Sequence, residues 1–252
     1  IRNISKFYNT SKNLFRINKG FKALSKISLK LFKGETLGLI GESGSGKTTL
    51  SNAILKIHEF EEGEILFKGK DISKIKEKEL LEFKKNVQII FQDPYASLNP
   101  LQNIFQIISE PIKFHRICSN DEVYEKCKEL INDVGLNETF LSRFPHELSG
   151  GQRQRVCIAR AISVNPQVLI CDESVSALDV SIQATVLNLL NLLKKKYNFT
   201  YIFISHDLSV VKYMSDKIIV LYNGEIVDYQ DADLLFEKPK DNYTKRLIKA
   251  SS

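Results

Sequence analysis

The sequence has few of the features that mark secreted, metal-binding or membrane-spanning proteins. Its four cysteines, Cys118, Cys127, Cys157 and Cys171, form no C-x-x-C pair and have no histidine at ligand spacing, which excludes an encoded zinc site or disulfide framework. No apolar run approaches the roughly 18 residues of a membrane span, and the N-terminus lacks a signal-peptide pattern. Any membrane contact is therefore expected through a partner. Because the chain begins at Ile1 and its single methionine is residue 214, we expect a longer native product.

The charge balance says little about a partner. Lys and Arg outnumber Asp and Glu by 36 to 30 in 252 residues, a formal net charge of +6, which suits nucleic acid or an anionic surface. The lysines are scattered, however, and the one tight run, at residues 194–196, ends an expected helix, where cations complement the dipole. Since no aromatic platform accompanies them, the composition favours a solvated basic surface over a nucleic-acid interface.

Short apolar runs alternate with helical stretches, as is typical of an α/β domain with a mainly parallel sheet. One further stretch has an apolar helical face that we assign to packing. We expect a helix from residue 47 to about residue 57. The expected strands cover residues 35–40, 87–91, 168–171, 200–205 and 217–222. The packing face consists of Ile182, Val186, Leu189, Leu190, Leu193 and Tyr197.

Two regions depart from this alternation. Residues 1–35 and 63–69 look like the strands and hairpins of a small antiparallel layer. Between residues 99 and 155 the strand signals vanish, so we predict a helical insert with breaks at Pro111 and Pro145. The polar stretch 237–242 is expected to be a linker into a short final helix.

Residues 41–48, here called the phosphate loop, have the sequence GESGSGKT and match the pattern G-x-x-x-x-G-K-[ST] between an expected strand and helix. Glycines let successive N–H groups turn inward around phosphates, Lys47 neutralises their oxygens, and the Thr48 hydroxyl can ligate Mg²⁺. A Gly-rich turn with a solvent lysine is the alternative, which the flanking elements disfavour. Nucleotide contacts are expected from Gly41, Ser43, Gly44, Ser45, Gly46, Lys47, Thr48 and Thr49.

Two carboxylates close the apolar strand at residues 168–171. Asp172 and Glu173 fall at the carboxyl edge, where α/β sheets bind ligands. We expect Asp172 in a Mg²⁺ shell and Glu173 on an attacking water, because phosphoryl transfer depends mainly on positioning and charge neutralisation. Acidic pairs at strand ends are also common structural features, so this assignment depends on the phosphate loop.

A third motif, at residues 148–152 (LSGGQ), runs directly into a helical pattern. Its glycines and N–H groups can bind phosphate at the helix start, or Ser149 can simply cap that helix. Together with the phosphate loop and the acidic pair, in this order along the chain, residues 148–152 resemble the signature motif of ATP-binding cassette (ABC) ATPases. We call them the signature loop.

The resemblance covers essentially the whole chain and implies roles that local physics does not assign. Gln92 matches the family's glutamine that contacts Mg²⁺ and water, and His206 matches the switch histidine that reaches the γ-phosphate. Tyr8 resembles the aromatic that stacks on adenine, with Phe15 and Phe21 following it in the sequence. The implied catalytic residues are Glu173, His206, Gln92 and Lys47, and the implied metal ligands are Thr48, Gln92 and Asp172. Further implied nucleotide contacts are Ser149, Gly150, Gly151, Gln152 and Asp179, the last in a loop at residues 176–179.

Finer features resemble the ATPase subunits of oligopeptide, dipeptide and nickel importers. They lie at residues 93–100 (DPYASLNP), 144–147 (FPHE), 176–184 (SALDVSIQA) and 243–247 (YTKRL). Two positions depart from that family's pattern. Ser174 replaces the usual proline, which frees a backbone φ and adds an N–H close to Glu173, and Asp241-Asn242 replace His-Pro. The chain also stops before the cysteine-bearing tail of many relatives, so we expect no iron–sulfur site.

The resemblance implies an α/β fold: a P-loop NTPase (RecA-like) core with a small antiparallel β layer and an inserted helical subdomain. Residues 1–252 would form one nucleotide-binding domain, with the core at 1–98 and 156–252 and the helical signature subdomain at 99–155. The implied function is ATP hydrolysis, with ATP and Mg²⁺ as cofactors, in an importer of peptides or a similar small solute. Two such subunits, identical or different, would sandwich two ATP molecules. Their implied partners are transmembrane permease subunits at the cytoplasmic face of the cell membrane and, indirectly, an extracytoplasmic solute-binding protein.

Two other functions compete with this interpretation. A soluble ABC protein acting on nucleic acid or ribosomes typically carries long coiled coils, zinc modules or two cassettes, whereas Gln92 and Ser149 here lie only 57 positions apart. A non-hydrolysing cassette would usually lack Glu173, His206 or the signature motif, and all are present. The sequence therefore favours an ATPase without a nucleic-acid partner.

Overall fold

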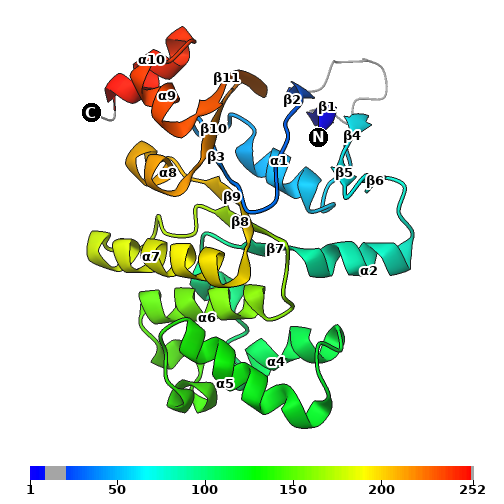
Figure 1. Cartoon of the computed structure of the whole chain (residues 1–252), viewed down its shortest axis with the longest axis vertical. Coiled ribbons are helices and arrows are strands. Elements are labelled where there is room, and N and C mark those ends of the chain that lie inside the picture. Colours follow the sequence, from blue (N-terminus) through cyan, green and yellow to red (C-terminus); the bar gives the residue numbers. More distant parts are fainter. Residues whose placement is uncertain (9–20, 251–252) are drawn as a thin grey trace, which may run out of the picture. The chain divides into compact units, whose positions relative to one another are not determined.

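The structure, a computed structural model, describes residues 1–8 and 21–250. The chain forms two compact units (Figure 1). Unit 1 comprises Ile1–Lys84 and Phe203–Ser252, and unit 2 comprises Lys85–Ile202. The boundaries between the units fall within helix α2 (Glu77–Asn86) and strand β9 (Thr200–Ile204).

The sheet of unit 1 brings together strands that are far apart in the sequence. Strand β10 (Lys217–Tyr222) pairs in parallel with β3 (Thr36–Ile40) and antiparallel with β11 (Glu225–Asp231). Every residue of β3 is buried, as expected for a strand of a covered parallel sheet. The strands predicted at residues 35–40 and 217–222 are therefore present as β3 and β10, and their predicted parallel arrangement is confirmed.

Helix α8 (Leu208–Met214) lies very close to β3. A Cβ on Gly38 would stand 2.5 Å from both Ser215 Oγ and Val211 Cγ1, so only glycine fits at this strand position. The close approach holds α8 directly over the strand that leads into the phosphate loop.

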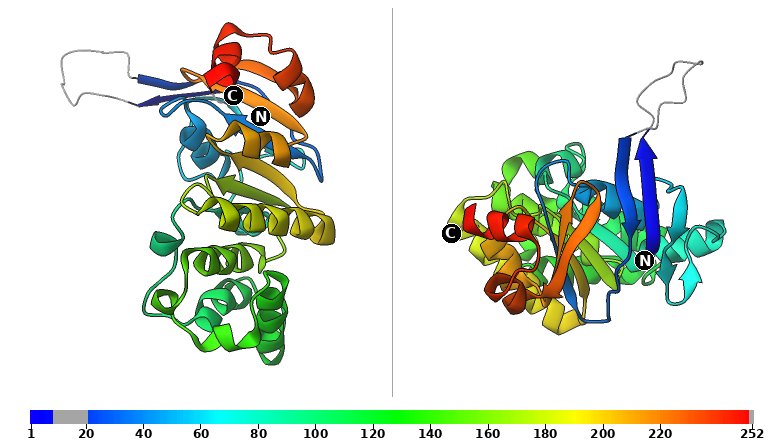
Figure 2. Two further views of the ribbon diagram at one scale, coloured as in Figure 1. Left: turned by 90° about the vertical axis from the view of Figure 1, so that its left-hand side faces the viewer. Right: turned by 90° about the horizontal axis from the view of Figure 1, so that it is seen from above.

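An antiparallel layer forms the other part of unit 1, as predicted. Figure 2 shows the two long strands of this layer, β1 and β2, side by side, and the register pairs Tyr8 with Phe21. Its strands β1 and β2 bury Ile4, Ala23, Leu24 and Ile27. The strands of the layer are β1 (Arg2–Tyr8), β2 (Phe21–Ile27) and β4 (Glu62–Glu64), and a hairpin follows with β5 (Leu66–Phe67) and β6 (Lys70–Asp71).

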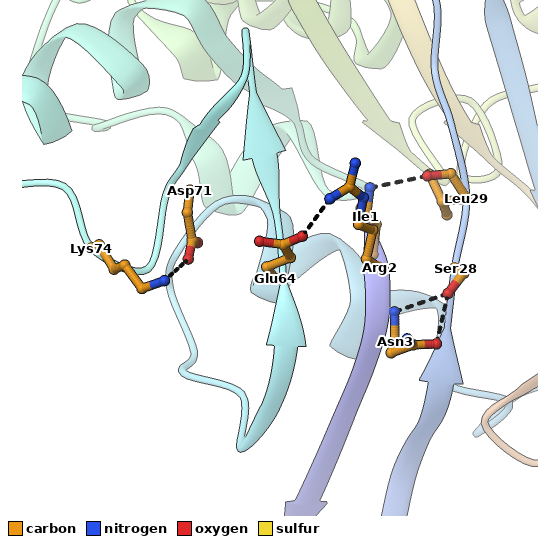
Figure 3. Close-up of polar contacts among 8 residues, drawn as sticks. All are labelled: Ile1, Arg2, Asn3, Ser28, Leu29, Glu64, Asp71 and Lys74. Carbon is orange, nitrogen blue, oxygen red and sulfur yellow. Dashed lines mark hydrogen bonds and ion pairs between the residues drawn. The ribbon is translucent and has the colours of Figure 1, made fainter.

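Polar contacts at the surface of this layer join neighbouring strands (Figure 3). Arg2 pairs with Glu64 at 2.8 Å, and the Asn3 N–H donates to Ser28 Oγ at 2.9 Å. Because the Arg2 side chain is 68% exposed, its ion pair contributes little to stability. Burial of the apolar side chains is therefore the main stabilising term of the layer.

The sequence predicted the start of the first helix of unit 1 and the final helix correctly, but not the end of the first helix. Helix α1 (Lys47–Ile54) starts where predicted but ends three residues early, because Lys56 has φ 54°, a left-handed value that no α-helix can continue. After β11 come α9 (Ala232–Glu237), a linker and α10 (Asn242–Ala250). The predicted linker and final helix are confirmed.

Unit 2 has its own parallel strands. Strand β7 (Val87–Ile90) pairs with β8 (Val168–Asp172), Val87 standing opposite Val168. Helix α7 (Val180–Tyr197) has three lysines in its last turn, as expected, and its inner side buries Val186, Leu187, Leu190 and Leu193. The predicted packing face is therefore confirmed at its centre and extended by Leu187.

Residues 99–155, all of which the structure describes, consist of helices joined by turns and loops and contain no strand. This confirms their predicted secondary structure. This region contains α4 (Ile104–Phe114), α5 (Val123–Asp133) and the start of α6 (Gly150–Ile162), and the short helix α3 (Pro94–Ser97) precedes it. Its 3₁₀ helices are η1 (Asn120–Glu122), η2 (Glu138–Ser142) and η3 (Pro145–Glu147).

The predicted helix break at Pro111 is wrong. Pro111 lies inside α4, where it removes one N–H donor from the helix. Ile107, Ile108 and Ile112 are at most 2% exposed, so burial of the surrounding turn offsets that loss. Pro145, in contrast, is the first residue of η3, a position at which a missing N–H leaves no bond unmade.

The cysteines in the described residues are free thiols. Burial raises the pKa of Cys127, Cys157 and Cys171 to about 12, so these side chains stay protonated and uncharged near neutral pH. In residues 1–8 and 21–250, no helix has both the length and the apolar character required to cross a membrane.

Candidate functional site

The phosphate loop joins β3 to α1 in unit 1. Gly44 and Gly46 have φ of 79° and 108°, values that favour glycine. Gly46 caps α1 without a side-chain hydrogen bond, and the first turn of the helix carries no acidic residue. The backbone N–H groups at this helix start therefore face no competing carboxylate of that turn, which suits an anion.

Backbone from two other segments presses against this loop. A Cβ on Gly46 would stand 2.7 Å from the Ala23 carbonyl oxygen, and one on Gly224 would stand 2.6 Å from the same atom. The Gly224 N–H also donates to the Ser45 carbonyl oxygen at 3.0 Å. The loop is thus held between β2 and the turn that joins β10 to β11.

Lys47 folds back over the loop. Its Nζ donates to the carbonyl oxygens of Gly41 at 2.7 Å and Glu42 at 2.9 Å, and only 7% of the residue is exposed. Thr48, the next residue, is exposed. The ammonium group is therefore placed within the loop, and the neighbouring hydroxyl is accessible from outside.

His206 also belongs to unit 1 and follows the end of β9, as predicted. It is exposed. The backbone after it is fixed because the Asp207 carboxylate accepts from the Ser209 N–H at 2.9 Å, while the Asp207 N–H donates to Ser205 Oγ at 3.0 Å. These contacts cap α8 and leave the imidazole at the surface.

Tyr8 lies at the end of β1 and is 38% exposed. Its ring contacts His58 edge-on, and the Lys6 ammonium lies 5.4 Å from its centre. Phe21 on the paired strand is 58% exposed, and Phe15 lies outside the described residues. A stacking surface is therefore present at Tyr8, and its assignment to adenine stays a prediction.

In unit 2, two predicted residues meet at the carboxyl edge of the parallel strands. Gln92, two residues beyond β7, donates through Nε2 to Glu173 Oε2 at 3.1 Å, and Glu173 follows Asp172 at the end of β8. Parallel neighbours end at the same sheet edge, which is why residues 81 positions apart come together.

Glu173 has an unusual backbone. Its φ is 46°, a left-handed value that costs a non-glycine residue about 1–3 kcal/mol. Ser176 supports this conformation, since both its N–H and its hydroxyl donate to the Glu173 carbonyl oxygen, at 3.1 and 2.9 Å. Such strain is commonly found at functional sites. Ser174, the residue at which the sequence departs from its family's pattern, is buried.

The signature loop in unit 2 starts α6 with a reciprocal cap. Ser149 Oγ accepts from the Gln152 N–H at 3.3 Å, and Gln152 Oε1 accepts from the Ser149 N–H at 2.9 Å. Both side chains therefore have a structural role in stabilising the helix start, which was the alternative interpretation of this motif.

The two glycines of the signature loop differ in their surroundings. A Cβ on Gly151 would stand 2.5 Å from Ile182 Cγ2 of α7, whereas one on Gly150 would meet only Leu178 Cδ2 at an ordinary 3.7 Å. Packing inside the chain therefore requires glycine at 151 and not at 150. Asp179, beside Leu178, is exposed at the start of α7.

Two arginines of α6 hold nearby loops in place, a role that was not predicted from the sequence. Arg153 donates to the Leu148 carbonyl oxygen at 2.5 Å and thereby holds the signature loop, and Arg160 donates to the Ser97 carbonyl oxygen at 2.5 Å and holds the end of α3. The Leu148 carbonyl lies just before α6 in the sequence, whereas the Ser97 carbonyl is 63 positions away and reaches the helix only through the tertiary fold, so the Arg160 contact has no local signal in the sequence.

Comparison with known proteins agrees with these features. The family model described as ABC transporter matches residues 24–176. The chain is 46% identical over 250 residues to the oligopeptide transport ATP-binding protein AppF of Bacillus subtilis, covering 98% of this chain and 76% of AppF. It is 50% identical over 231 residues to OppF of the same organism, which bears the same description, covering 91% and 76%. A dimeric, post-hydrolysis structure of the ATP-binding cassette MJ0796 with ADP and Pi superposes with a TM-score of 0.80 at 28% identity, covering 92% and 97%.

The contrast between the two glycines can be tested by Gly151→Ala, with Gly150→Ala as its matched control. Both changes improve helix propensity by a similar amount, so the difference between them isolates the clash with Ile182, whose branched side chain cannot move aside freely. Overpacking of this kind costs about 1–3 kcal/mol. Denaturant unfolding should show Gly151→Ala to be less stable than Gly150→Ala by that amount. Equal stability would contradict the packing described at residue 151.

Proposed function

The chain belongs to the ABC transporter family, and from that premise we propose that it is the ATP-hydrolysing subunit of an importer of peptides or a similar small solute. It has the P-loop NTPase fold of ABC ATPases and binds a nucleotide. The observation that carries the proposal is the phosphate loop, in which Lys47 Nζ lies against the loop's own carbonyl oxygens. The similarity to AppF and OppF, both oligopeptide transport ATP-binding proteins, supports oligopeptides as the solute class. Neither family nor relatives support a function on nucleic acid or ribosomes.

Within this proposal the phosphate loop binds the nucleotide's phosphates. The backbone N–H groups of the phosphate loop other than that of Glu42, and those at the start of α1, surround them, and Lys47 exchanges its two carbonyl partners for phosphate oxygens. Tyr8 provides the surface on which adenine stacks. The division into a core at 1–98 and 156–252 and a helical signature subdomain at 99–155 is part of the same proposal.

The side chains present fit a Mg²⁺ ion that arrives with the nucleotide. This metal keeps several waters and binds one or two protein groups plus phosphates. The exposed Thr48 hydroxyl, the Asp172 carboxylate and the Gln92 amide oxygen are ligands of the required oxygen type. In the described residues no cluster of three or more His, Cys, Asp or Glu side chains is arranged for a metal, so no all-protein cage competes with this arrangement. The bound ion would neutralise charge on the phosphates.

Glu173 acts as the general base in the proposed hydrolysis. Water attacks the γ-phosphorus, a new P–O bond forms as the bond to the β,γ-bridging oxygen breaks, and the water's proton passes to Glu173. Gln92 orients that carboxylate through its 3.1 Å hydrogen bond. His206 contacts the γ-phosphate, and ADP and phosphate leave.

The working form is a dimer in which the signature loop of one subunit completes the nucleotide site of the other. Support comes from Gly150, which is not required by packing inside its own chain and leaves room for an approaching phosphate. The matched cassette MJ0796 is dimeric. Asp179, exposed beside the signature loop, would contribute to the same contact.

The remaining partners are membrane components. ATP-driven closure of the dimer and reopening after hydrolysis would be transmitted through the helices of residues 99–155 to transmembrane permease subunits. This places the chain at the cytoplasmic face of the cell membrane. An extracytoplasmic solute-binding protein would deliver the solute, and it would act on this chain only indirectly.

Glu173→Gln tests the catalytic assignment. Removing the carboxylate while keeping the side chain's size should preserve ATP binding and lower turnover by about 10²- to 10⁴-fold, the range expected for loss of a general base. The measurements are ATP titration and steady-state phosphate release. Glu110→Gln, which neutralises an exposed carboxylate of α4, is the control and should hydrolyse ATP normally. Normal turnover by Glu173→Gln would rule Glu173 out as the base.

Lys47→Ala tests the phosphate loop. A charge-assisted hydrogen bond contributes about 1.5–3 kcal/mol, so ATP affinity should fall about 10- to 150-fold. Direct titration measures it, with Lys33→Ala, an exposed lysine of unit 1, as the control. Equal ATP affinities of wild type and Lys47→Ala would show that the loop does not hold the phosphates.

The dimer predicts complementation between two different defects. Gly150→Glu is suited to this test because an acid at the first helical position stabilises α6 and repels phosphate. A mixed dimer of Lys47→Ala and Gly150→Glu chains has both defects in one composite site and an intact second site. Its ATPase activity should exceed that of either mutant homodimer; for a native heterodimer, the two changes are divided between the partners.

A mixed dimer as inactive as its parents would indicate either obligatory coupling of the two sites or no contribution between chains. Cysteines introduced at Ser149 of one chain and in the phosphate loop of the other distinguish these explanations. Cross-linking in the presence of ATP identifies coupling. Failure to cross-link would overturn the dimer model.

A further inference from the structure

A side chain from the C-terminal helix of unit 1 contacts the phosphate loop. The hydroxyl oxygen of Tyr243, on α10, accepts the Glu42 N–H at 3.0 Å across 201 positions of sequence. We propose that Tyr243 is a positioning residue that fixes the phosphate loop in its binding conformation, so that the C-terminal segment sets nucleotide affinity. This inference rests on the proposed function of the loop.

The contact uses a backbone donor within the phosphate loop. The Glu42 N–H is directed to Tyr243, and the Glu42 carbonyl oxygen accepts from the Ser45 N–H at 3.1 Å and from Lys47 Nζ at 2.9 Å. Both sides of residue 42 are therefore tied to defined partners. Without the Tyr243 hydroxyl, the first half of the loop would lose the hydrogen bond that restrains that N–H and would sample other conformations before nucleotide binds.

The segment that carries Tyr243 is itself anchored. Asp228 of β11 is 4% exposed, and one oxygen of its carboxylate accepts the N–H groups of Lys240 at 2.9 Å and Asp241 at 3.3 Å. The Asp241 carboxylate in turn accepts the Tyr243 N–H at 2.7 Å. A buried carboxylate thus fixes the linker and the start of α10, and with them the backbone of Tyr243.

The ring of Tyr243 is fixed as well. It lies 4.2 Å from the Tyr222 ring, measured between centroids, with planes inclined by 34°, and the residue is 6% exposed. Burial raises the pKa of its hydroxyl above the ordinary 10.0. The hydroxyl therefore stays neutral at physiological pH. Burial and the contact with Tyr222 fix the orientation of the ring, whose oxygen faces the loop.

Positioning of this kind has a distinct kinetic result. Tyr243 touches no reacting atom, and its hydrogen bond is made before nucleotide arrives and is kept afterwards. Its loss should thus weaken binding of the ground state and the transition state equally. Such a change raises KM and leaves kcat unaltered, whereas general destabilisation of the fold would reduce the active fraction and lower the apparent kcat.

The test is Tyr243→Phe, which keeps the ring and removes only the acceptor. One net hydrogen bond corresponds to a loss of ATP affinity of about 2- to 12-fold, with kcat at saturating ATP unchanged. Tyr222→Phe is the matched control, because it removes a hydroxyl from the neighbouring ring, and its affinity should equal that of wild type. Unchanged affinity in Tyr243→Phe would overturn the inference.

A double-mutant cycle identifies the partner of the hydroxyl. Glu42→Pro removes the N–H, and Glu42→Ala removes the same side chain but keeps the N–H. If the hydroxyl acts through this donor, Tyr243→Phe should weaken ATP binding in the Glu42→Ala background and have no further effect in the Glu42→Pro background. An equal effect in both backgrounds would overturn the inference.

Hydrogen exchange of the nucleotide-free protein separates this inference from the proposed function and needs no Glu42 variant. The Glu42 amide should exchange faster in Tyr243→Phe than in wild type or Tyr222→Phe, and equal rates would overturn the contact. A wild-type chain that binds no ATP would overturn the proposed function. A wild-type chain that binds ATP with the same affinity as Tyr243→Phe would overturn this inference alone.

Discussion

The close approach of backbone around Ala23 is the constraint on which the phosphate loop depends. Gly46 and Gly224 both lie too near the Ala23 carbonyl oxygen to carry a Cβ, and Ser45 is tied to Gly224 by a backbone hydrogen bond. The loop is thus set by contacts between main-chain atoms, which side-chain motion cannot loosen. Because α1 starts at the end of this loop, the direction of its first N–H groups follows from the same contacts.

In unit 2 the loops at the candidate site are held mainly by side-chain hydrogen bonds. Its signature loop is fixed by the Ser149 and Gln152 cap and by the Arg153 guanidinium on the Leu148 carbonyl oxygen. Its carboxylate edge depends on Glu173, which adopts a left-handed φ and is supported by hydrogen bonds from Ser176. Both arrangements hold polar groups at element ends with hydrogen bonds inside the unit.

The features found from the sequence were those encoded within short segments. A buried strand, a Gly-rich turn and a helix start are local patterns, so β3, the turn that follows it and the start of α1 were placed correctly. Pro111 was misjudged because its local rule ignores the burial that holds α4 together. The contacts of Tyr243 and Arg160 could not be found, since their partners are main-chain groups 201 and 63 positions away, and any residue could supply those groups. The residues 243–247 were noticed only as a resemblance.

The case for a second subunit depends on Gly150, a glycine that contacts within one chain do not explain. The cap accounts for Ser149 and Gln152, and the contact with Ile182 accounts for Gly151. Gly150 has ordinary space around a Cβ and no left-handed φ, and alanine would make a better helix start there. A glycine without a local reason points to close approach by something outside the chain. A phosphate group at a helix start needs that space, because its oxygens must come within hydrogen-bond distance of the backbone N–H groups.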